Sequence, residues 1–203
     1  MNYKILDNQM RMFSEKLKIE VGVRDDEIGK VATTVAAEVR FLNHSAKETV
    51  LAASPVPLAN RLEELISFQA WMDIASKIVA NPAISRAQVI VQNYICFVYL
   101  SEACFRALRK VAPPGSLTRR CCQFLTDNPT RAFRNAIAHS NWTYLPDFSG
   151  LVFWSKKGSD PDEALSRFEV MQEDLNFWQA LSRAVAYSAY TTLNNVKPSR
   201  KGV

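Results

Sequence analysis

The stretch that decides the fold is SRAQVIVQNYICFVYLSEACFRALRKV, residues 85–111. It contains neither Gly nor Pro, and between Val89 and Leu100 apolar residues occupy nearly every face of a helix. This pattern is typical of a buried helix. Because Gln92 and Asn93 interrupt the run, it falls short of the roughly 20 apolar residues that a membrane span needs. We therefore predict one helix from Ser85 to Val111 at the centre of a helical bundle.

Helical spacing of apolar residues continues through most of the chain, and Pro and Gly separate the periodic segments. Further helices are expected over residues 5–19, from the acidic pair Asp25–Asp26 to Ala53, and over residues 58–80, 117–126, 129–139 and 174–193. Trp142–Leu145 and Leu151–Trp154 flank the turn sequence PDFSG and predict a short β-hairpin. The expected fold class is all-α, in one domain over residues 1–203. Within it, residues 1–53 form an N-terminal helical hairpin, packed on or appended to a core of residues 58–195.

Composition excludes several classes of protein. The chain has 203 residues, 48% apolar and 22% charged, which is ordinary for a soluble globular protein. Its six Gly residues are scattered, so a phosphate-binding glycine loop or a dinucleotide-binding fold is not expected. The first residues lack the apolar run of a secretory signal, and we expect a cytoplasmic protein. The four Cys residues match no metal-binding spacing, and we assign them to packing.

Positive charge is concentrated in one region of the chain. The formal net charge is +5. Between Ala103 and Asn141 the only acidic residue is Asp127, whereas seven residues are basic: Arg106, Arg109, Lys110, Arg119, Arg120, Arg131 and Arg134. Such a basic stretch attracts polyanions through phosphate contacts, and it predicts RNA-binding roles for Arg119, Arg120 and Arg131.

The segment RAFRNAIAHSNW, residues 131–142, combines polar and apolar residues on opposite sides of its helix. At about 100° per residue, Phe133 and Ile137 share one side. Arg131, Arg134, Asn135 and His139 share the other side.

These residue types suit cleavage of a phosphodiester bond. Arginine binds phosphate through two parallel hydrogen bonds, and histidine transfers protons near neutral pH. No carboxylate cage lies on this face, so we expect no metal and no cofactor. The attacking group would then be the 2′-hydroxyl of the substrate, which only RNA provides. A purely structural interpretation stays open, because a histidine near a helix C-terminus also stabilises the helix dipole. Trp142, Trp154 and Trp178 could stack on bases, but we expect them to pack in the core.

The motif Arg134-Asn135-x-x-x-His139 resembles the RxxxxH signature of the HEPN superfamily. The segments RNAIAHSNWTY (134–144) and EVMQEDLNFWQALSRA (169–184) are similar to a HEPN family found in bacterial genomes and on plasmids. The resemblance covers about residues 58–195.

This resemblance implies a HEPN-like helical bundle that forms a homodimer, with two copies of the motif facing one cleft. It further implies a metal-independent endoribonuclease that acts as a toxin or in phage defence, with an antitoxin protein as a possible partner. Arg134 would stabilise the phosphate, Asn135 would position the motif, and His139 would transfer protons. The alternative is a non-catalytic HEPN module that binds RNA, a nucleotide or a partner protein.

Overall fold

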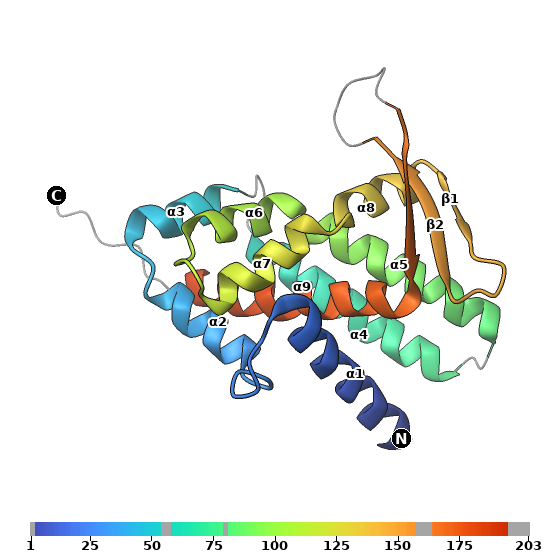
Figure 1. Cartoon of the computed structure of the whole chain (residues 1–203), viewed down its shortest axis with the longest axis horizontal. Coiled ribbons are helices and arrows are strands. Elements are labelled where there is room, and N and C mark those ends of the chain that lie inside the picture. Colours follow the sequence, from blue (N-terminus) through green and yellow to red (C-terminus); the bar gives the residue numbers. More distant parts are fainter. Residues whose placement is uncertain (1–2, 54–57, 79–80, 157–163, 195–203) are drawn as a thin grey trace. The chain divides into compact units, whose positions relative to one another are not determined.

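The computed structural model describes residues 3–53, 58–78, 81–156 and 164–194. This described part is mostly helical and contains nine helices and a three-stranded antiparallel sheet (Figure 1). The helices are α1 (Tyr3–Val21), α2 (Val31–Arg40), α3 (His44–Ala52), α4 (Leu58–Ile78), α5 (Pro82–Tyr99), α6 (Glu102–Val111), α7 (Leu117–Asp127), α8 (Thr130–Ala138) and α9 (Gln172–Asn194). The strands are β1 (Trp142–Tyr144), β2 (Gly150–Ser155) and β3 (Ser166–Met171). The prediction of a predominantly helical protein is confirmed. None of the described helices is long and apolar enough to cross a membrane.

Two of the predicted helices are each divided in two, so those predictions are wrong. The helix predicted to end near Ala53 is α2 and α3, and Asn43 caps α3 by accepting a hydrogen bond from the Ala46 N–H at 2.9 Å. The helix predicted over residues 85–111 is α5 and α6. Leu100 ends α5 with φ −100° and ψ 73°, although no Pro or Gly stands there. The Leu100 side chain is buried, and its packing holds this turn in place. Because the break depends on tertiary packing, no helix-breaking residue marks it in the sequence.

The predicted hairpin is present, but it belongs to a larger sheet. β1 pairs antiparallel with β2, and Trp142 lies opposite Phe153. β3 then pairs with the other edge of β2 and was not predicted. Most of the polar loop expected at residues 156–162, and the frayed tail expected at residues 197–203, lie outside the described residues.

The chain folds into two compact units that alternate along the sequence. The first comprises residues 1–61, 103–124 and 184–203, and the second comprises residues 62–102 and 125–183. This division differs from the predicted grouping of residues 1–53 against residues 58–195, because the N-terminal helices share a unit with α7 and the end of α9.

Polar contacts of the first unit fix the start of α7. The Glu38 carboxylate accepts the backbone N–H groups of Leu117 and Thr118 at 3.0 and 2.8 Å, which satisfies two donors that a helix N-terminus leaves open. One turn further along, Arg120 donates to both carboxylate oxygens of Glu27 at 2.8 and 2.7 Å. Burial by itself raises the pKa of Glu27. The hydrogen bonds from the Arg120 side chain and the Arg24 backbone, together with the positive charges of these two arginines, outweigh burial, and the pKa lies below its ordinary value.

The four cysteines are buried and reduced, so their assignment to packing is confirmed. Burial raises the pKa of the Cys96 thiol and that of the Cys121 thiol to about 12. Since the thiolate is the reactive form, these cysteines are inert in the folded protein.

The second unit is built around a column of phenylalanine rings. Phe133 of α8 is fully buried, and its ring meets that of Phe97 in α5 edge-on, with centroids 6.0 Å apart. On its other side it meets Phe153 of β2 at 5.8 Å, and Phe153 stacks on Phe168 of β3 at 5.2 Å. The column fixes α8 between α5 and the sheet.

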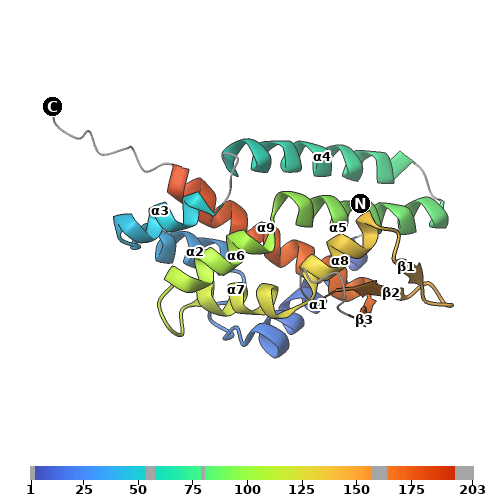
Figure 2. The same ribbon diagram turned by 90° about the horizontal axis from the view of Figure 1, so that it is seen from above.

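α4 runs alongside α5 in the second unit (Figure 2), where the Tyr99 hydroxyl donates to Glu64 at 2.8 Å. Leu62, Leu65 and Met72 are buried, as the predicted stripe of α4 requires. α5 buries Ile90, Cys96 and Phe97 but leaves Ile84, Val91 and Val98 exposed. Contrary to the prediction of an enclosed central helix, α5 therefore has one apolar face that is partly exposed.

Candidate functional site

The predicted motif lies on α8 and at its C-terminal end. Phe133 and Ala136 are buried in the second unit, and this orients the opposite side of the helix outward. There Arg131 and His139 are exposed, whereas Arg134 and Asn135 are half-buried. The expected separation of polar and apolar faces is confirmed for Phe133, whereas Ile137, predicted on the same apolar side, is half-buried. Pro129 is the N-cap residue of α8.

The side chains of Arg134 and Asn135 form a fixed pair. The Arg134 Nε and Nη2 atoms donate to Asn135 Oδ1 at 3.2 and 2.8 Å. Arginine has five N–H donors, so this clamp leaves the others available to a ligand. Among the described residues no carboxylate pairs with Arg134. The clamp therefore presents an uncompensated positive charge in a defined orientation.

His139 is the residue at which α8 ends, with φ −102° and ψ 9°. Its backbone N–H bonds to the Asn135 carbonyl at 3.0 Å. Two further bonds close the helix end: the Ser140 N–H donates to Ile137 at 3.2 Å, and the Asn141 N–H donates to Ala136 at 2.8 Å. This pair of bonds is the Schellman motif, which requires a left-handed residue. Ser140 takes that conformation with φ 59°.

The imidazole of His139 thus projects from a tightly hydrogen-bonded helix end. The sequence suggested that it could touch Asn135, but the Asn135 amide oxygen is bonded to Arg134 instead. Within the described part of the chain, the structure gives the imidazole no hydrogen bond or ion pair. The imidazole is therefore exposed at the helix end and has no partner within the described chain.

The three arginines predicted to bind RNA have different surroundings. Arg131 is exposed on α8 in the second unit. Arg119 and Arg120 belong to the first unit, where Arg119 donates to the Ala112 carbonyl at 3.3 Å. Arg120 is bound to Glu27 and also to the Gly22 carbonyl. An RNA phosphate at Arg120 would have to compete with the Glu27 carboxylate, whereas Arg131 meets no such competition.

The other histidine and three of the tryptophans differ in their exposure. His44 of α3 is exposed, and its Nε2 atom lies 3.0 Å from the Glu48 carboxylate. Trp178 is buried, as predicted, whereas Trp142 and Trp154 are half-buried. Where the structure describes the chain, no three His, Cys, Asp or Glu side chains are grouped to hold a metal ion.

Sequence reasoning missed Arg86, Tyr144, Phe148 and Gln172, which border a depression in the second unit. Tyr144 and Phe148 were visible as aromatic residues of the predicted hairpin. Arg86 and Gln172 are 86 positions apart in sequence, and only the fold brings them together.

No protein-family model, curated protein or solved structure matches the chain.

Proposed function

We propose that this protein is a cytoplasmic, metal-independent endoribonuclease of the HEPN type, which cleaves RNA through attack by the 2′-hydroxyl group. The observation that carries the proposal is the arrangement at the end of α8. A guanidinium clamped by Asn135 and without a carboxylate partner in the described chain, and the exposed His139, both lie on the side of the helix away from buried Phe133.

Each residue has a defined role in the proposed reaction. The 2′-oxygen of the substrate bonds to the adjacent phosphorus, and the bond from phosphorus to the 5′-oxygen of the next nucleotide breaks. A base takes the proton of the 2′-hydroxyl, and an acid gives a proton to the departing 5′-oxygen. His139 serves in this proton transfer. Arg134 stabilises the extra negative charge on the phosphate oxygens, and Asn135 holds Arg134 in position. The products end in a 2′,3′-cyclic phosphate and a 5′-hydroxyl.

The same chemistry favours a homodimer. A single imidazole cannot be base and acid in one step, and α8 presents one histidine. A second copy of the motif across a shared cleft would supply the other group, as the HEPN resemblance implies. Arg131 on the exposed side of α8 would add an RNA phosphate contact. A role as a toxin or in phage defence, with an antitoxin protein as partner, belongs to the same proposal.

The test incubates the purified protein with end-labelled single-stranded RNA in EDTA and determines the ends of the fragments. Fragments with cyclic phosphate ends support the proposal. Arg134→Lys keeps the charge but loses the planar fork, so it should cleave much more slowly. Arg167→Lys is the matched control, since Arg167 lies on β3 near Glu169 and away from α8 in sequence. RNA binding without cleavage would instead establish the non-catalytic module.

A further inference from the structure

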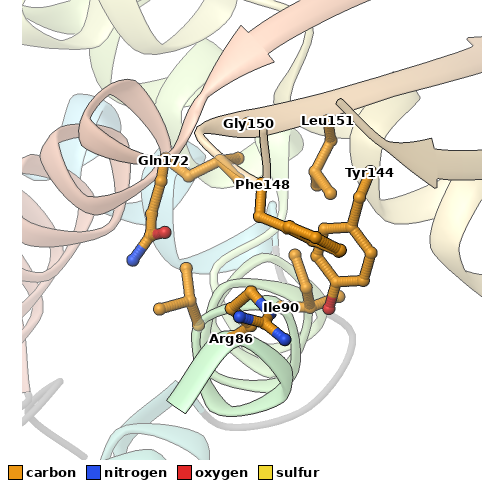
Figure 3. A pocket seen from close by; sticks show the side chains of 9 residues that line it. Arg86, Ile90, Tyr144, Phe148, Gly150, Leu151 and Gln172 are labelled. Atoms are coloured by element: carbon orange, nitrogen blue, oxygen red, sulfur yellow. The ribbon is translucent and has the colours of Figure 1, made fainter. Parts of the chain in front are cut away.

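A shallow surface depression lies in the second unit, outside the motif. It is bordered by α5, by the turn between β1 and β2, and by the first turn of α9. Figure 3 shows Arg86 next to Phe148, with Gln172 on one side of them and Tyr144 on the other. Ile90 and Leu151 contribute apolar lining. The depression therefore combines aromatic rings, one positive charge and one amide.

The aromatic rings form a continuous row that begins near the motif. Trp142 meets Tyr144 edge-on at 5.2 Å, and Tyr144 lies 5.5 Å from Phe148. The guanidinium carbon of Arg86 stands 4.3 Å from the centre of the Phe148 ring. Trp142 follows His139 by three residues, so their Cα atoms are at most about 11 Å apart. A bound chain that reaches His139 can thus extend onto this row.

Phe148 is held in a conformation that is costly for a bulky residue. Its φ of 60° is left-handed, yet 46% of its surface is exposed, so burial does not offset the strain. The turn around it is firmly built. The Phe148 N–H bonds to the Leu145 carbonyl at 2.9 Å, and Asp147 accepts two hydrogen bonds from Ser149. At Gly150 a Cβ would collide with the Val170 carbonyl oxygen. The fold thus presents an exposed ring at a fixed position.

Arg86 brings a positive charge that no carboxylate in the described part of the chain neutralises through an ion pair. Its side chain is half-buried, and stacking on Phe148 leaves the N–H edges of the guanidinium available. Guanidinium edges bind phosphate oxygens, and an amide such as that of Gln172 both donates and accepts hydrogen bonds.

We infer that this depression is a second RNA subsite, which takes one unpaired base of single-stranded RNA together with an adjacent phosphate. The base stacks on Phe148 beside Tyr144, its polar edge bonds to Gln172, and the phosphate pairs with Arg86. The ligand is single-stranded because bases within a duplex cannot stack on a protein ring. This inference rests on the proposed ribonuclease function, and it makes single-stranded regions the substrate class.

The test uses a labelled eight-nucleotide 2′-O-methyl RNA, which binds but cannot be cleaved because its 2′-oxygen is blocked. Phe148→Ala should weaken binding by about 5- to 100-fold. It should leave unchanged the binding of an abasic oligomer of the same length. Arg86→Gln should reduce the slope of log affinity against log salt by about 0.7, which is one phosphate contact on a single strand. The matched controls are Phe41→Ala and Arg167→Gln, both at exposed positions outside the depression.

The outcomes separate this inference from the proposed function. If Phe148→Ala and Arg86→Gln both melt like the parent and bind the oligomer like the parent, the subsite is refuted, even when the parent cleaves ordinary RNA. Equal weakening for the intact and abasic oligomers would also overturn it, because no base would be recognised. If the parent binds the oligomer through the depression but cleaves no RNA, the subsite stands and the nuclease proposal fails. If Phe148→Ala does not fold, the salt dependence of RNA binding by Arg86→Gln decides the test: an unchanged slope refutes the subsite.

Discussion

Ser140→Gly tests whether the helix end that carries His139 is built as described. Ser140 has φ 59°, a conformation that costs an L-residue about 1–2 kcal/mol and glycine almost nothing. Glycine loses more backbone freedom on folding, which returns about 0.5–1 kcal/mol. The difference predicts a net stabilisation of about 0.5–1 kcal/mol. For a chain of this size, that raises the melting temperature by about 1–4 °C.

The matched control is Ser67→Gly. Ser67 is exposed inside α4, where glycine only lowers helix propensity, so this variant should melt at a lower temperature than the parent. Thermal denaturation followed by circular dichroism measures both variants. The opposite signs of the two shifts are the signature of a left-handed residue. Destabilisation by Ser140→Gly, equal to that of Ser67→Gly, would refute the Schellman motif and with it the placement of His139.

The remaining predictions concern ionisable groups. Glu27→Gln should lower the free energy of unfolding by about 1.5–3 kcal/mol, because the charge-assisted bonds from Arg120 are lost, and urea denaturation measures this loss. Since the pKa of Glu27 is lower in the folded state than in the unfolded chain, its contribution is full above the ordinary pKa of 4.5 and disappears as the pH falls through the folded value. A parent and a Glu27→Gln variant that lose stability equally between about pH 6 and about pH 3 would contradict this account. Cys96 and Cys121, with pKa values of about 12, should react with iodoacetamide at pH 8 at least about 1,000 times more slowly in the folded protein than in urea, as mass spectrometry of the alkylated peptides can show. Comparable rates in both states would disprove the protection by burial.

The sequence predicted those elements whose local signals agree with their tertiary packing. Leu175, Trp178, Leu181 and Val185 follow helical spacing, and all four are buried in α9. The hairpin was predictable because turn residues separate two short apolar strands. The opposite faces of α8 followed from its spacing alone, since Phe133 is buried and Arg131 is exposed.

Other features depend on contacts that local sequence does not encode. The break at Leu100 has neither Pro nor Gly. β3 did carry a local signal, because half-buried Phe168 and buried Val170 alternate with exposed Arg167 and Glu169. The cap of α3 did have a signal, because Asn43 is a favoured N-cap residue. The pair between Arg120 and Glu27 joins residues 93 positions apart. For this reason charge counting along the chain assigned Arg120 to RNA without revealing its carboxylate partner.

The most direct test of the account compares RNA cleavage by the parent, His139→Ala and His44→Ala in EDTA. The chain has two histidines, and both are exposed, so His44→Ala controls for the loss of an imidazole. The account predicts that His139→Ala lowers the cleavage rate by about 10²- to 10⁴-fold, while its melting temperature and RNA affinity stay close to those of the parent. His44→Ala should cleave like the parent. Equal cleavage by all three proteins would contradict the central claim that His139 transfers the protons of the reaction.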